Sequence, residues 1–179
     1  MAYTVTSPQI GYPIIAGIDA GYLPPSSVSA GTTTTYPTTP AALGSVVKAI
    51  DPTYGEGEFI FLAGVASTAV GSVVAYDTAT FQTKLAPVGS FKPEPIAVAM
   101  AATGAGSFGW YQISGNARAK KTSGLALASN AAVGVLTAGL IAATGSGKEV
   151  QGALTVAKAT ASTLVTLVIN RPHMQGRIT

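Results

Sequence analysis

Short apolar runs separated by turn residues fill most of the chain after Asp51. β-branched and aromatic residues dominate these runs, and Gly, Pro, Asn or Asp interrupts them at short, fairly even intervals. Such spacing is typical of a sandwich or barrel of antiparallel strands. We therefore expect an all-β fold, a compact β-barrel or β-sandwich, with strands at residues 58–62, 72–76, 84–87, 96–101, 109–114, 117–121, 132–136, 150–155 and 163–170.

Turn and strand-ending residues refine this expectation. Residues 163–170 form the firmest predicted strand, since β-branched residues dominate there and Pro172 should prevent continuation through a central strand. We expect hairpin turns within residues 77–84 and at Gly115 and Asn116, because Gly and Asn adopt positive φ at low cost. The Ala-rich residues 125–132 leave a short helix open as an alternative.

The first fifty residues follow a different pattern, rich in Pro and Thr and without a strand or helix period. Proline fixes φ and lacks a backbone donor, which predicts an extended N-terminal arm over residues 1–50, a β domain over residues 51–172 and a tail over residues 173–179. Apolar side chains in an arm gain free energy only when its own domain or a neighbouring subunit covers them. We expect the following residues to anchor the arm on a partner: Tyr3, Ile10, Tyr12, Ile14, Ile15 and Tyr22.

Trp110 and Tyr111 are neighbours in a predicted strand and should point to opposite faces of the sheet. We expect Trp110 to enter the core, while the amphipathic ring of Tyr111 contacts a partner. Tyr111 therefore joins the predicted partner-binding residues.

The composition suggests that much of the surface is covered in an assembly. Charged residues make up 9% of the 179 residues, whereas an ordinary soluble domain has about 25%. A weakly charged surface disperses poorly in water, so burial against other subunits is the favoured interpretation. The alternative is a β protein that Ser and Thr hydroxyls hydrate well enough without a partner.

Charge patterning argues against nucleic acid as a partner. The net charge is +3 and the basic residues are scattered, whereas nucleic-acid binders concentrate them on one element. The one small group, Arg118, Lys120 and Lys121, is explained by a solvated strand end. The uncharged residues 124–147 contain too many small and polar residues for a membrane span.

The residues needed for catalysis or metal binding are sparse. The chain has no cysteine and one histidine, His173, which we expect to be a solvated or interface residue of the tail and not a base for Ser107, whose surroundings fall one residue short of a nucleophile elbow. Glu56 and Glu58 are the closest carboxylates, and nothing else in the sequence supports a glycosidase-like pair. We therefore expect no enzymatic activity, no catalytic residue, no cofactor, no metal and no small-molecule substrate.

Four apolar segments with glycines carry a resemblance to a known family: residues 58–68, 71–76, 95–100 and 108–115. Together they resemble the core of small head proteins of tailed bacteriophages, over roughly residues 56–172. The resemblance implies a compact β domain, often a homotrimer, that decorates the exterior of the capsid as a cement protein. It further implies that the major capsid protein is the partner, and that the chain is made in the host bacterial cytoplasm, in keeping with the absence of a signal-like start at Met1.

Two other functional classes stay open. A carbohydrate-binding or receptor-binding β module would expose aromatic residues on the domain, yet four of the seven tyrosines lie in the arm, at positions 3, 12, 22 and 36. A tail or tube component would share the composition and differ in symmetry, forming rings or stacked arrays.

Overall fold

The computed structural model describes residues 3–5, 18–19, 21–22, 41–89, 92–145, 148–160 and 162–176. These residues form strands and turns, which confirms the all-β fold class, and none of them lies in a helix. The alternative of a short helix at residues 125–132 is therefore wrong. That segment turns and forms a single bridge between Leu127 and Ala159, and Leu125 and Leu127 pack on the core while Ala126 and Ala128 are exposed.

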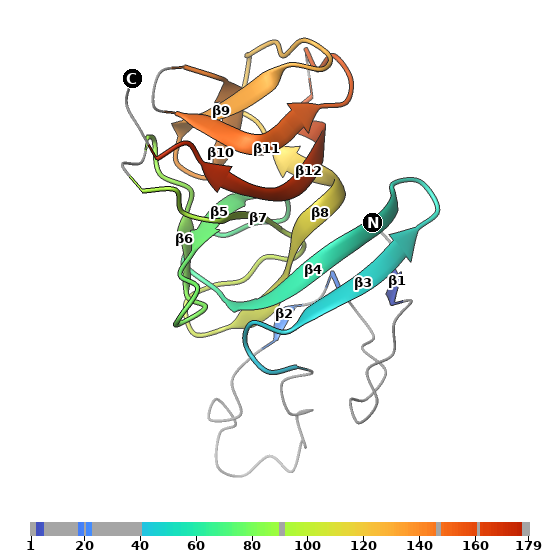
Figure 1. The fold of residues 1–179 in the computed structure, drawn as a ribbon, viewed down its shortest axis with the longest axis vertical. Helices are drawn as coiled ribbons and strands as arrows, with labels where there is room; N and C mark the ends of the chain where they lie inside the picture. Colours follow the sequence, from blue (N-terminus) through green and yellow to red (C-terminus); the bar gives the residue numbers. More distant parts are fainter. Residues whose placement is uncertain are drawn as a thin grey trace.

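Figure 1 shows the strands in chain order. Their bounds are β1 (Thr4–Val5), β2 (Gly21–Tyr22), β3 (Val46–Asp51), β4 (Gly55–Ala63), β5 (Val73–Tyr76), β6 (Thr83–Leu85), β7 (Ile96–Ala99), β8 (Phe108–Lys120), β9 (Ala132–Thr137), β10 (Leu140–Ala143), β11 (Glu149–Thr155) and β12 (Leu164–Met174).

All of these strands join one antiparallel sheet that curls on itself like a half-barrel. Its main path runs β1-β3-β4-β8-β12-β11-β9-β10, while β2 and β7 also pair with β8, and β5 links β6 to β7. In Figure 1 the long strand β8 runs from the lower group around β3 and β4 to the upper group of β9–β12. The curl brings β5, β6 and β7 under the upper group, so that side chains of both parts share a core.

The structure corrects the prediction of a hairpin turn at Gly115 and Asn116. The two predicted strands, residues 109–114 and 117–121, form the single strand β8, because β12 pairs with it without interruption from Ser114 to Lys120. Gly115 has the positive φ expected of a turn residue, at +94°. Here it lets β8 bend where the strand passes from β4 to β12, instead of reversing the chain.

Pro172 does not end the last strand, contrary to the prediction. β12 leaves β8 after Asn170 and continues beside β11, where His173 pairs with Gln151 and Ile169 pairs with Ala153. The residues between His173 and Ile169 face Gly152 alone and form a bulge, so the missing N–H of Pro172 interrupts no ladder bond.

The sheet begins before the predicted boundary at Asp51 and extends into the predicted tail. β3 pairs along its whole length with β4, from Val46 opposite Ile60 to Asp51 opposite Gly55. His173 and Met174, placed in the tail by the sequence, belong to β12, and Met174 is fully buried.

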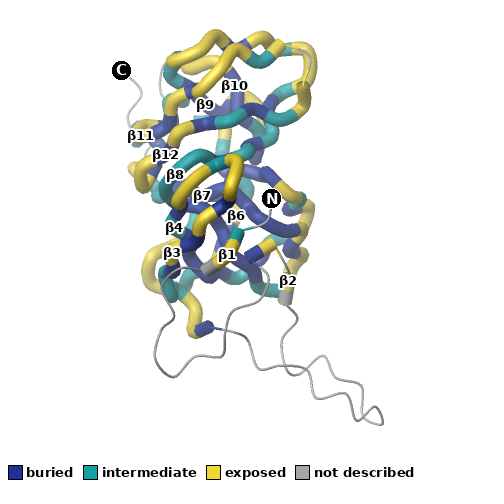
Figure 2. Tube along the Cα trace, turned by 90° about the vertical axis from the view of Figure 1, so that its right-hand side faces the viewer, coloured by how far each residue is buried: buried dark blue, intermediate teal, exposed yellow. Residues whose placement is uncertain are grey.

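In the part of the chain that the structure describes, three clusters of buried side chains lie on different faces of the curled sheet, and Figure 2 shows the buried segments along the middle of the molecule. The upper cluster lies between β9–β12 and β5–β7 and includes Val98, Val135, Leu167 and Met174. The outer cluster includes Ile18, Val47, Phe59, Phe61 and Trp110. The inner cluster includes Ile60, Leu62, Val74, Tyr111 and Ile113.

Candidate functional site

Tyr111 lies in the interior of the chain, so the prediction that its ring contacts a partner on an exposed face is wrong. Trp110 and Tyr111 point to opposite faces of β8 as expected, but both are fully buried, in the outer and inner clusters respectively. Both faces of β8 are covered because β4 and β8 lie between the outer and inner clusters. The Tyr111 hydroxyl is bonded to the Thr103 hydroxyl, and burial raises the pKa of Tyr111.

Tyr3, predicted as an anchor on a partner, packs against the chain's own domain. Its ring meets Phe59 edge to face, with ring centroids 4.7 Å apart. Its hydroxyl donates to the Asn116 carbonyl oxygen at 3.2 Å, and burial raises the pKa of Tyr3 to about 12. Tyr3 thus attaches the start of the chain to β4 and β8.

The structure describes less of the other predicted anchors. The backbone of Tyr22 pairs with Phe108 in the β2–β8 ladder. Ile10, Tyr12, Ile14 and Ile15 lie outside the described residues.

The small basic group on β8 is not a uniformly solvated strand end, as the sequence suggested. Lys121 is only 3% exposed, and its Nζ donates to the carbonyl oxygens of Leu125 at 2.7 Å and Thr160 at 3.4 Å. The ammonium group therefore ties the end of β8 to two loops. Arg118 is half-buried, and its guanidinium donates to the Tyr54 hydroxyl at 3.3 Å.

The carboxylates that could suggest catalysis are engaged in ion pairs. Glu58 accepts from Arg171 at 2.9 Å, and Glu56 lies 3.4 Å from the Lys48 ammonium. His173 lies 3.0 Å from the side-chain oxygen of Gln151. Among the described residues no group of three or more metal-binding side chains occurs, and no helix there is long and apolar enough to cross a membrane.

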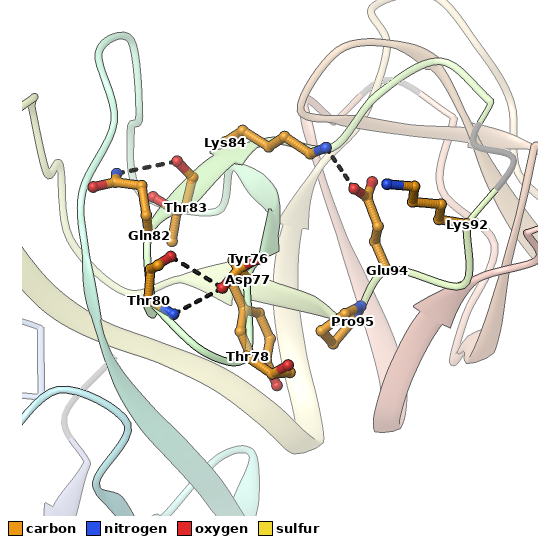
Figure 3. A pocket seen from close by; sticks show the side chains of 10 residues that line it. All are labelled: Tyr76, Asp77, Thr78, Thr80, Gln82, Thr83, Lys84, Lys92, Glu94 and Pro95. Atoms are coloured by element: carbon orange, nitrogen blue, oxygen red, sulfur yellow. Dashed lines mark hydrogen bonds and ion pairs between the residues drawn. The ribbon is translucent and has the colours of Figure 1, made fainter.

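A polar pocket of about 430 Å³ opens beside the β5–β6 hairpin. Figure 3 shows its lining, which combines hydroxyl, amide, carboxylate and ammonium groups with the rings of Tyr76 and Pro95. The Lys84 ammonium and the Glu94 carboxylate pair at 2.6 Å on one side. On the other, Asp77 accepts from the backbone of Thr80 and Ala79, and these bonds hold its pKa below the usual value. Hydroxyl-rich ligands suit such a lining.

A second feature is apolar and lies on the outward face of β11 and β12. Leu154 on β11 is paired across the ladder with Val168 on β12, and each side chain is 45% exposed. Val156, just beyond β11, is 43% exposed, and its backbone N–H donates to the Thr166 carbonyl oxygen. We call Leu154, Val156 and Val168 the apolar strip. Sequence reasoning missed it because an exposed valine in an alternating strand cannot be distinguished from a buried one until the faces are known.

Comparison with models of known protein families finds no match to this chain, and comparison with curated proteins also finds none.

Proposed function

We propose that the chain is a structural virion protein that decorates and stabilises the capsid of a tailed bacteriophage by binding across major capsid protein subunits. The observation that carries the proposal is a β surface that presents large apolar side chains, on a chain in which charged residues make up 9%. Eight large apolar side chains among the described residues are more than a third exposed: Leu43, Ile50, Val70, Val88, Leu136, Leu154, Val156 and Val168.

The positions of these side chains fit a cementing role. Most of them lie singly, on different strands and loops, and each supplies a small contact of about 25 cal/mol per Å² of apolar surface buried. A shell repeats every contact many times, so individually weak contacts add up through multivalency. Glu56, Glu58 and Glu94 are engaged in ion pairs within the chain, so the proposed contact with the capsid relies mainly on shape and apolar surface.

The resemblance to phage head proteins supplies the rest of the proposal: location on the capsid exterior, the major capsid protein as partner and a homotrimer as the assembling unit. The predicted anchors Ile10, Tyr12, Ile14, Ile15 and Tyr22 remain the proposed contacts of the arm with that partner. Tyr3 is excluded from this set because its ring is committed to Phe59 of the same chain.

The test is co-sedimentation of the purified protein with capsids that lack it. We expect the protein to pellet with the capsids and to raise the temperature at which they lose their contents. A variant combining Tyr12→Ala, Ile14→Ala and Ile15→Ala should pellet less, while it spares the Tyr3 contact that the domain needs. Wild-type protein that stays in the supernatant at every capsid concentration contradicts the proposal.

A second candidate function is carbohydrate binding, which the polar pocket of Figure 3 favours. Thr78 lines the pocket and is exposed, so Thr78→Arg would fill the pocket without disturbing the core. Thr137→Arg, at an exposed position on β9, is the matched control. Glycan retention by the wild type and by the control, but not by Thr78→Arg, would favour this function over capsid decoration.

Rings or stacked arrays in electron micrographs would favour a tail or tube component.

A further inference from the structure

The apolar strip has the composition of the centre of a subunit interface. Leu154 and Val168 lie side by side on the outward face, and Gly152 and Ala153 beside them leave a shallow groove of about 350 Å³. Alternate residues of both strands, such as Ala153, Val165 and Ile169, point inward into the upper cluster and hold this face in place. An apolar centre with polar groups at its margin is the usual arrangement of protein interfaces.

The two ends of the strip carry opposite charge. Glu149, at the start of β11, lines the groove at one end together with Asn170. Beyond Val156 the face continues into a second hollow, whose lining includes Arg118 and Lys158. Since β11 advances ~3.3 Å per residue, the acidic end and the basic end lie well apart on one face.

This charge pattern is complementary to itself. If a second copy lies face to face with the first across a two-fold axis, its strip runs in the opposite direction. Glu149 of each copy then faces Lys158 and Arg118 of the other, while Leu154 and Val168 meet their counterparts at the centre. A two-fold contact requires one patch to fit itself in this way.

Among the described residues, the other exposed apolar side chains do not form a second surface that could pair with the strip. Leu43, Ile50, Val70, Val88 and Leu136 lie on different strands and loops, and no two of them are ladder partners. The described surface that matches the strip in both apolar character and charge is therefore the same face of another copy.

We infer that two copies of the chain associate through the outward face of β11 and β12, with the apolar strip at the centre and Glu149 opposite Lys158 and Arg118 at each end. This inference does not depend on the proposed virion role. A two-fold contact cannot close a trimer, so it predicts either a dimer or an assembly of two trimers joined through this face.

The first experiment measures mass in solution by light scattering over a range of protein concentrations. We expect an even multiple of the 17.8 kDa chain mass for the wild type. Val168→Glu places a carboxylate at the centre of the interface and should weaken association about tenfold or more. Val88→Glu is the matched control, because Val88 is 47% exposed and lies outside the strip, and it should leave the mass unchanged.

The second experiment reverses the charges at the two ends, using exposed or half-exposed positions that leave the core intact. Glu149→Lys alone or Lys158→Glu alone should weaken association at low salt, and the double variant should recover most of the loss. A wild-type monomer or trimer would overturn the inference. So would an even assembly that Val168→Glu and Val88→Glu weaken equally, or charge variants that show no recovery when combined.

Discussion

Among single residues, Tyr3 shows how the beginning of the chain is fixed to the sheet. Its ring covers Phe59, and its hydroxyl reaches the Asn116 carbonyl oxygen on β8, so one side chain contacts both β4 and β8. Burial disfavours the charged phenolate, and the nearby Asp51 carboxylate acts in the same direction, whereas a hydrogen bond with Gln112 opposes them. The raised pKa links this contact to the stability of the protein at high pH.

We predict that stability falls as the pH rises from about 10 to about 12 and that Tyr3→Phe makes this fall shallower. The pKa of Tyr3 is raised from 10.0 to about 12. The unfolded chain therefore loses the proton first, and the stabilisation is complete below pH 10 and disappears through pH 12. Urea unfolding at pH values from about 8 to about 11 measures the slope of the free energy of unfolding against pH. Identical slopes for the two proteins would show that Tyr3 does not lie against the sheet, although Tyr76 and Tyr111 also have raised pKa values and keep some slope in both.

Residues also show where sequence reasoning reaches its limit. Alternation placed Trp110 and Tyr111 on opposite faces of one strand, and the structure agrees. It could not show that both faces of β8 are covered, because that depends on Phe59 and Ile60 of a strand fifty residues earlier. Likewise the sequence could not place Lys121 in the interior, since the carbonyl groups that satisfy its ammonium belong to two loops.

At the scale of the elements, the bend in β8 depends on Gly115. Any other residue there would have to adopt a backbone φ of +94°, and its Cβ would overlap the Glu56 carbonyl oxygen of β4. Two other glycines separate these effects. Gly55 has a φ of +78° but open space around its Cα, and at Gly104 there is open space and no positive φ.

We predict a graded loss of stability when each of these three glycines is replaced by alanine. Gly104→Ala should change the free energy of unfolding by no more than about 0.5 kcal/mol, because it meets neither strain nor contact. Gly55→Ala should cost about 1–2 kcal/mol for the left-handed backbone alone. Gly115→Ala adds the overlap with β4 and should cost more than about 3 kcal/mol. Urea unfolding gives the free energy of unfolding of all three variants. A Gly115→Ala variant that is no less stable than Gly55→Ala would mean that β8 bends without close contact with Glu56.

The sequence predicted most strands but not their connections. The turn at residues 77–84 was correct because Asp77 holds it locally, through its bonds to Ala79 and Thr80. The turn at Gly115 was wrong because a positive φ serves a bend as well as a reversal, and pairing with the distant β12 decides between them. β1, β2, β3 and β10 were missed, the first three because they lie in or beside the proline-rich region and the last because its Ala-rich residues 140–143 give little strand signal.

At the scale of the whole molecule, the arrangement of the buried clusters determines how cooperatively the sheet unfolds. The described residues form three clusters, and β8 contributes to all of them: Ala117 and Ala119 to the upper, Trp110 to the outer and Tyr111 to the inner cluster. A strand that belongs to every cluster cannot lose one of them without exposing its own side chains. We therefore expect the described sheet to unfold as one unit, although its upper and lower parts look distinct in Figure 1.

A substitution in one cluster, followed by a probe in another, tests this coupling. Leu167 is 1% exposed in the upper cluster, and Leu167→Ala should cost about 2–5 kcal/mol through lost contacts and a residual cavity. Trp110, the one tryptophan of the chain, is fully buried in the outer cluster and reports on it by fluorescence. If the sheet is a single cooperative unit, Leu167→Ala lowers the urea midpoint of Trp110 fluorescence as much as that of circular dichroism. A fluorescence midpoint that stays at the wild-type value would show that the molecule contains two units that unfold separately, although both include β8.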